Sequence, residues 1–171
     1  MASTNAPENV KSYALGLGVL YNPSSSHIER LINDISSDEL LEDIAISAMS
    51  MKNKPIAKKI IEKMSDQDCL HNLFEYACQG KSLYMTWILP RLENPKINII
   101  KNTLSACESL SEPSLLLLMP HISKEDEVKI FQLMPKKGMW SKHERLFNSI
   151  KQEHLKINDM TSIKSPSFSP I

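Results

Sequence analysis

The chain has 171 residues, 42% hydrophobic and 23% charged, so it is long and apolar enough to form one globular domain. Its 20 basic and 20 acidic residues balance, which excludes a general electrostatic attraction to nucleic acid or to acidic membranes. It contains four glycines, and β-branched residues rarely alternate with polar ones, so a β-sheet fold is disfavoured.

Apolar residues recur along the chain with a period of 29 residues. One aligned column contains Leu31, Ile60, Leu89, Leu118 and Phe147. Within a period, apolar residues fall at i, i+3, i+4, i+7 and i+8, which is the stripe of an amphipathic helix. Each period has two such stripes, so the pattern predicts about five hairpins of two helices each.

The predicted helices follow one another in chain order, two to a period. The first helix of each hairpin is expected near residues 9–20, 38–51, 67–79, 96–109 and 125–134. The second helix is expected near residues 25–35, 55–64, 82–92, 113–122 and 141–156. Ser36, Ser65 and Ser123 precede acidic first turns and are the predicted N-caps. Pro55 and Pro113 are expected near helix starts, where proline is tolerated.

The predicted fold is all-α: a short right-handed solenoid of about five helical hairpins. The repeat domain is expected to span residues 9–156, between a flexible N-terminus (1–8) and a disordered tail (157–171) rich in serine and proline. Its hairpins are like those of HEAT and ankyrin repeats in architecture only. Because the 29-residue period is shorter and the motifs of those repeats are absent, we assign no family.

Small residues occupy one column of the first helices. Ala48, Ala77 and Ala106 stand one period apart, and they are expected to lie where neighbouring helices pack closely. Cys78 and Cys107 follow two of these alanines on the same stripe. We therefore expect both thiols to be buried and reduced, since cysteine packs as a small hydrophobe.

Motifs for catalysis, metal binding or phosphate binding are not found in the sequence. The five histidines form no HxxxH or HExxH pair, and no GxGxxG or GxxxxGK[ST] loop is present. Acidic neighbours such as Asp38 and Glu39 fall at a predicted helix start, where they complement the helix dipole. We predict no catalytic, cofactor or metal site, and an enzyme remains an alternative only if its site is assembled from dispersed residues.

Basic residues gather in the second and fifth periods. These clusters are Lys52, Lys54, Lys58, Lys59 and Lys63, and Lys136, Lys137, Lys142 and Arg145. Helical repeats can contact phosphates through such side chains. Aromatic residues that would stack on bases do not alternate with them, so a solvated face is favoured and nucleic-acid binding is the alternative.

Two middle helices, LYMTWILPRL and PSLLLLMPHI, are apolar nearly all round. Trp87 and Ile88 in one, and Leu116 and Leu117 in the other, align with mostly charged residues of other periods. Apolar faces of this kind are usually shielded from water. These helices could be packed into the core, or covered by the tail, by a second copy of the chain or by a partner protein. These four residues are the predicted protein-binding site.

We therefore expect a non-enzymatic adaptor that binds an unidentified protein or associates with itself, without cofactors. Three cysteines provide no disulfide framework and favour a reducing, cytoplasmic location. The N-terminal segment lacks the apolar core of a cleavable signal peptide. The longest apolar runs, about ten residues, are too short for a membrane span. Secretion through a non-cleaved signal is the alternative location.

Overall fold

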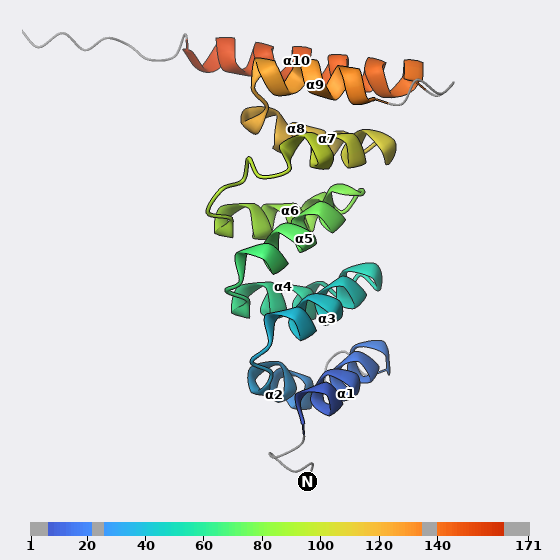
Figure 1. Cartoon of the computed structure of the whole chain (residues 1–171), viewed down its shortest axis with the longest axis vertical. Helices are drawn as coiled ribbons and strands as arrows, with labels where there is room; N and C mark the ends of the chain where they lie inside the picture. Colours follow the sequence, from blue (N-terminus) through green and yellow to red (C-terminus); the bar gives the residue numbers. More distant parts are fainter. Residues whose placement is uncertain (1–6, 22–25, 135–139, 163–171) are drawn as a thin grey trace, which may run out of the picture. The chain divides into compact units, whose positions relative to one another are not determined.

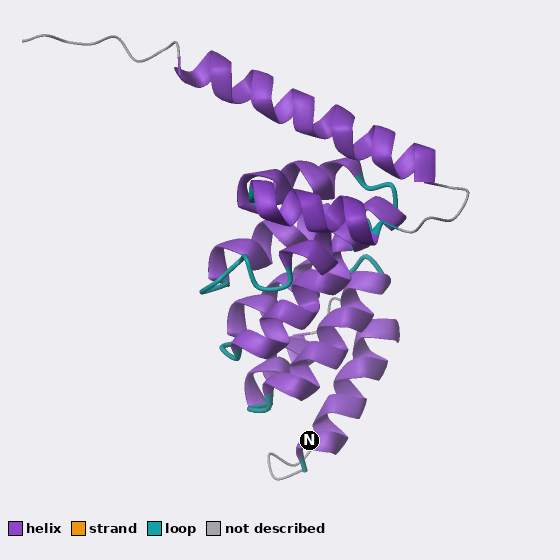
Figure 2. Ribbon diagram, turned by 45° about the horizontal axis from the view of Figure 1, so that its top comes forward, coloured by secondary structure: helices purple, strands orange, loops and turns teal. Residues whose placement is uncertain are grey.

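The computed structural model describes residues 7–21, 26–134 and 140–162, and within these ranges it is helical without a strand (Figure 1) (Figure 2). The elements are α1 (Glu8–Tyr21), α2 (Ser26–Asp34), α3 (Asp38–Ser50), α4 (Lys54–Lys63), α5 (Gln67–Cys78), α6 (Ser82–Ile88), η1 (Leu89–Arg91), α7 (Ile99–Glu108), α8 (Glu112–Leu118), η2 (Met119–His121), α9 (Lys124–Leu133) and α10 (Trp140–Ser162). The all-α prediction is confirmed for this part of the chain.

Each predicted helix has a counterpart in the described ranges. The last one, α10, continues past its predicted end at residue 156 to Ser162, because its sequence contains no proline or glycine. The segment predicted as a disordered tail is therefore helical over residues 157–162. Residues 1–6 of the predicted flexible N-terminus, residues 163–171 of the tail, and Lys136 and Lys137 lie outside the described residues.

The chain divides into two compact units. The first contains α1 to α6 with η1, and the second contains α7 to α10 with η2. In the first unit, α1 packs on α2 and α3, α2 and α3 pack on α4, and α4 packs on α6. In the second unit, α7 packs on α8, α9 and α10, and α8 packs on α10. The pairs α1–α2, α3–α4 and α7–α8 are next to each other in the chain, and most of the other pairs are two places apart.

Most residues of the predicted inner stripes lie in the cores of the two units, but Leu31 and Leu89 are only partly buried. In the first unit, fully buried side chains include Leu41, Ile60 and Phe74. In the second unit, Phe147 is buried and its ring meets that of Phe131 edge to face at 5.3 Å between centroids. Burying side chains of this size stabilises each by about 1.5–3 kcal/mol relative to leaving it in water.

The predicted alanine column and inner cysteines are confirmed as buried. Ala48, Ala77 and Ala106 have no exposed surface. Cys78 and Cys107 follow two of them in the chain, are buried and are not joined in a disulfide. The absence of a larger side chain at the alanine positions lets the helices approach, so these residues set the distance between neighbouring backbones.

A left-handed residue closes the turn after each of three helices. Lys52 after α3 and Leu110 after α7 have φ angles of 58° and 51°, and Gly80 after α5 has a φ of 93°. In the first two turns the following amide donates to the carbonyl of Ala48 or Ala106, at 2.8 and 2.9 Å. This is the Schellman arrangement, which satisfies carbonyls that the helix end leaves without partners.

One N-cap prediction is confirmed, and two are wrong by one residue. Ser123 forms a reciprocal capping box with Asp126 at the start of α9. The N-cap of α3 is Ser37 rather than Ser36. At the start of α5 the capping residue is Asp66 rather than Ser65, and its carboxylate accepts a bond from the Cys69 amide at 2.9 Å. The amides of the two mispredicted serines are instead bound by acids of the preceding hairpin.

Those bonds join residues about one period apart. The Ser36 amide donates to Glu8 at 2.9 Å, and the Ser65 and Asp66 amides donate to Asp38 at 2.7 and 2.5 Å. An acid at the start of one hairpin's first helix therefore accepts bonds at the entrance to the next hairpin. The carboxylate also lies at the positive end of the next helix, where negative charge is stabilised.

Basic side chains of one hairpin bond the C-terminal end of the second helix of the preceding hairpin. The Lys63 amine donates to the carbonyls of Ile32 and Asn33, in the last turn of α2, at 2.6 and 2.8 Å. Arg91 donates to the carbonyl of Met64, the C-cap of α4. Cations are favoured at this end of a helix because the terminal carbonyls are negative and lack intrahelical partners.

Prolines shape both ends of the second helices. Pro55 and Pro113 lie in the first turns of α4 and α8, as predicted. Pro90 and Pro120 end α6 and α8 earlier than predicted, because proline has no amide for the carbonyl four residues before it. The chain tightens there into the 3₁₀ turns η1 and η2.

Candidate functional site

The four predicted binding residues differ in burial. Ile88 is fully buried, so it belongs to the core of the first unit and we leave it out of the candidate surface. Trp87, its neighbour on α6, is only partly buried. Leu116 and Leu117 on α8 are also partly buried, but they belong to the second unit and are described separately.

An apolar residue that sequence reasoning missed lies beside Trp87. Leu83 is 40% exposed and precedes Trp87 by one helical turn on α6. Residues spaced i and i+4 share one face of a helix, so Leu83 and Trp87 form a single apolar strip. The i, i+4 spacing from Trp87 is the sequence signal that identifies Leu83.

The Trp87 ring is held from two sides. Its ring meets that of Tyr84 edge to face, with 5.4 Å between centroids, and Tyr84 is buried, which raises the pKa of its hydroxyl. The Lys58 amine of α4 lies 6.0 Å from the centroid of the Trp87 ring. These contacts restrain the indole before any partner arrives, so binding would cost little side-chain entropy.

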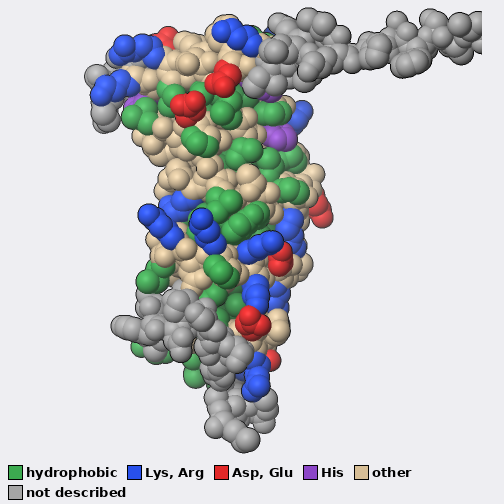
Figure 3. Space-filling view, turned by 180° about the vertical axis from the view of Figure 1, so that it is seen from behind, with side chains coloured by type: hydrophobic (Ala, Val, Ile, Leu, Met, Phe, Trp, Pro, Cys, Tyr) green, Lys and Arg blue, Asp and Glu red, His purple; other side chains and the backbone are tan. Residues whose placement is uncertain are grey.

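Lysines of α4 border this strip. Lys54 and Lys58 are exposed one turn apart, and α4 packs on α6. Seen from behind, basic side chains (blue) lie around hydrophobic ones (green) at the level of these two helices (Figure 3). We name Lys54, Lys58, Leu83 and Trp87 the Trp87 surface.

Other lysines of the predicted basic cluster are engaged inside the protein. Lys59 pairs with Glu29, and Lys63 donates to carbonyls in the last turn of α2. Partial burial lowers the pKa of the Lys63 amine. A shallow pocket of about 340 Å³ lies between α2 and α4, lined by Glu29, Ile32, Asn33, Lys59, Glu62 and Lys63. Its charged groups already have partners, Glu29 with Lys59, Glu62 with Lys58 and Lys63 with backbone carbonyls, so they offer little to a ligand.

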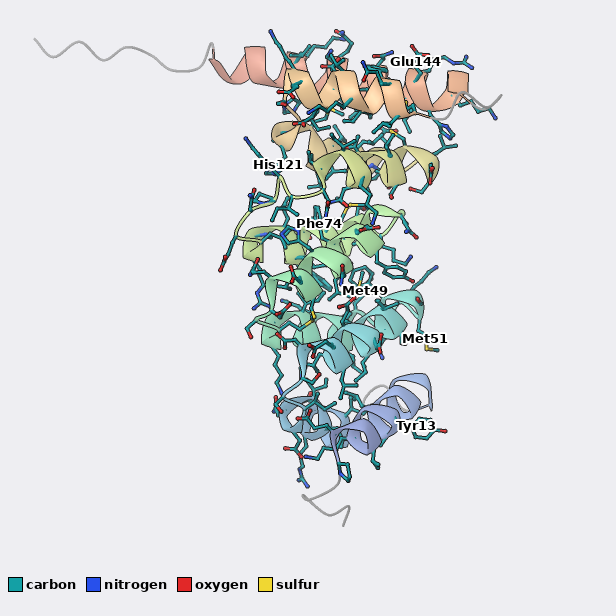
Figure 4. All side chains as sticks on the ribbon, in the orientation of Figure 1. Tyr13, Met49, Met51, Phe74, His121 and Glu144 are labelled. Carbon is teal, nitrogen blue, oxygen red and sulfur yellow. The ribbon has the colours of Figure 1, made fainter. Side chains whose placement is uncertain are left out.

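A second exposed apolar area lies on the outer face of α1. Tyr13 is 71% exposed and Val10 is 51% exposed. The Tyr13 side chain points away from the helices of its unit, whereas Phe74 points in among them (Figure 4). Lys11, which is partly buried, is the one lysine of α1. Tyr13 therefore serves as an aromatic control for the Trp87 surface.

The buried thiols are poorly suited to nucleophilic chemistry. Burial raises the pKa of Cys107 to about 12. Burial, with Glu42 and Asp66 nearby, raises the pKa of Cys69 to about 12 as well. Because the thiolate is the reactive form, both groups are protonated and inert at neutral pH. Among the described residues, no group of three or more His, Cys, Asp or Glu side chains could hold a metal ion.

Comparisons with known proteins do not assign a function. No protein-family model, curated protein or solved structure matches the chain. Among the described helices, none is long and apolar enough to cross a membrane.

Proposed function

We propose that the protein is a non-enzymatic interaction module that binds another protein through the Trp87 surface. The observation that carries this proposal is the restrained, partly exposed indole of Trp87 beside the exposed side chain of Leu83. Tryptophan is the residue that most often concentrates binding energy at protein interfaces. Leu116 and Leu117 remain predicted contributors in the second unit.

We also infer that the hairpins continue as a right-handed solenoid with the 29-residue period. Packing between helices two places apart in each unit supports this inference. So do the repeated left-handed turns and the hydrogen bonds between residues one period apart. A solenoid offers an extended surface rather than a deep pocket, which suits binding to a protein. The buried cysteines, which are outside disulfides, support a reducing, cytoplasmic location.

Nucleic-acid binding through the second-period lysines is the alternative. Engagement of Lys59 by Glu29 and of Lys63 by backbone carbonyls weakens it, because those amines are already partnered. An enzyme is a further alternative, but the raised pKa values of Cys69 and Cys107 remove two candidate nucleophiles.

The proposal is tested by affinity capture from native cells with wild-type chain and two matched variants. Trp87→Ala is expected to lose the specific partner, and Tyr13→Ala, which removes a more exposed aromatic side chain from α1, is expected to keep it. Leu116→Glu tests whether α8 contributes. Sedimentation of the same variants tests self-association.

Circular dichroism must show that each variant retains its helicity. Normal capture of every specific partner by folded Trp87→Ala would refute the proposal. A salt-dependent complex of wild type with duplex DNA or RNA, in place of a protein partner, would favour the nucleic-acid alternative.

A further inference from the structure

We propose that the Trp87 surface binds an acidic amphipathic helix, with apolar side chains on one face and carboxylates along its edge. This inference rests on the proposed function and adds the chemistry of the partner. It follows from the geometry of two neighbouring helices of the first unit, α4 and α6.

The surface consists of two rows. Leu83 and Trp87 form an apolar row on α6, one helical turn apart. Lys54 and Lys58 form a basic row on α4, with the same spacing and at the same positions of the 29-residue repeat. Since α4 packs on α6 and the Lys58 amine lies 6.0 Å from the Trp87 ring centroid, the two rows meet at Lys58 and Trp87.

This spacing matches one turn of a partner helix. Residues i and i+4 of a helix are separated by about 6 Å along its axis. A helix lying along α6 can therefore place two apolar side chains, one turn apart, against Leu83 and Trp87. Its acidic residues on the adjoining edge then meet Lys54 and Lys58. Docking an apolar helix face between neighbouring helices is a common mode of peptide recognition.

The amine of Lys58 is accessible to such carboxylates. Its present partner is Glu62, at 3.7 Å, and both side chains are more than half exposed, so the pair is weak. A carboxylate of the partner, desolvated beside the indole, can replace or join Glu62. The acid that pairs with Lys58 is therefore Glu62, whereas Glu29 pairs with the neighbouring Lys59.

The apolar row also favours a peptide over a polyanion. Leu83 has no flat face on which a base could stack, and apolar side chains at the centre of a site gain nothing from a phosphate backbone. Carboxylates flanking apolar anchors satisfy both rows at once, which gives the partner both affinity and a defined orientation.

Selection of random peptides displayed on phage against the full chain tests the inference without a known partner. Enriched peptides are expected to combine Leu, Phe or Trp with nearby Asp or Glu. For a labelled synthetic peptide from this set, fluorescence anisotropy should show at least a tenfold loss of affinity with Trp87→Ala, about 1.4 kcal/mol. Lys58→Glu should weaken binding similarly, and binding should weaken as salt rises.

Charge exchange gives the sharpest control. A peptide whose acids are replaced by lysine should bind Lys58→Glu better than it binds wild type. Lys124→Glu, which reverses an exposed lysine on α9, should bind the original peptide normally. Lys58→Gln repeats the test without placing a second acid beside Glu62.

The outcomes separate the two proposals. Neutral or basic peptides that still depend on Trp87 would overturn the acidic partner and leave the proposed function standing. If the affinity of the selected peptides is unchanged by Trp87→Ala, both the proposed function of the Trp87 surface and the acidic partner are overturned. Failure to enrich any peptide, or failure of the charge exchange, would overturn the inference about partner chemistry.

Discussion

At the scale of single residues, Leu110 has a backbone conformation that suits glycine better than leucine. Its φ is 51°, whereas the equivalent turn after α5 uses Gly80. Left-handed backbone costs a residue with a Cβ about 1–2 kcal/mol. The side chain is 49% exposed, so its loss removes little packing. Leu110→Gly should raise the free energy of unfolding, by about 0.5–1 kcal/mol after the entropy cost of glycine.

The matched control at this position is Leu110→Ala, which removes the same exposed side chain but keeps a Cβ. Urea denaturation of the two variants is the measurement. Equal stability of the glycine and alanine variants would show that the turn carries no strain.

Burial also lowers the reactivity of the Cys69 and Cys107 thiols, because it raises their pKa. All three cysteines are buried and outside disulfides, and burial raises the pKa of Cys107 and of Cys69 to about 12. The unfolded thiols titrate near 9.0. Above that pH the unfolded chain releases protons that the folded chain retains, so these groups destabilise the fold progressively between pH 9 and 12.

At the scale of helices and hairpins, Asp38 joins two successive hairpins. Its carboxylate accepts bonds from the amides of Ser65 and Asp66. Asp38→Asn keeps the shape but removes the charge, and should lower the free energy of unfolding by about 1–2 kcal/mol. Glu39→Gln is the control, because Glu39 shares the first turn of α3 but bonds only locally, to Ser37.

Thermal or chemical denaturation measures both variants. If Glu39→Gln costs as much as Asp38→Asn, the effect belongs to the dipole of α3 and not to the bond between hairpins. The larger cost at Asp38 would show that cross-hairpin hydrogen bonds contribute to stability.

At the scale of the whole molecule, the solenoid hypothesis predicts that damage to one hairpin spreads to its neighbours. Ala106 is fully buried on α7, and Ala106→Leu should overpack that region by about 1–3 kcal/mol. Native-state hydrogen exchange should then show faster exchange in α5 and α6 as well as in α7 to α9. Exchange changes limited to the second unit would indicate independent units instead.

Ala14→Leu controls for the added volume, since Ala14 is exposed on α1. It should leave the exchange rates of both units close to those of wild type. Strong destabilisation by this variant would mean that α1 packs more tightly than its exposure indicates.

The candidate surface was only partly predictable. The apolar character of α6 identified Trp87, because tryptophan breaks a column of mostly charged residues. The same pattern did not show that Trp87 is partly exposed while Ile88 is buried, although the two residues lie about 100° apart around the helix. Which of two adjacent apolar residues turns inward depends on how α4 packs on α6, and that packing is not encoded in the periodicity of either helix alone.

The sequence by itself determined the number, order and approximate ends of the helices, along with the burial of Ala48 and Cys107. Periodic apolar residues, prolines and caps act within a few residues, so a linear pattern reveals them. Tertiary structure alone decided that Ser36 binds Glu8 instead of capping a helix, that Lys63 bonds the end of α2, and that Leu83 stays exposed. These outcomes depend on groups about one period apart, which become neighbours when the hairpins pack.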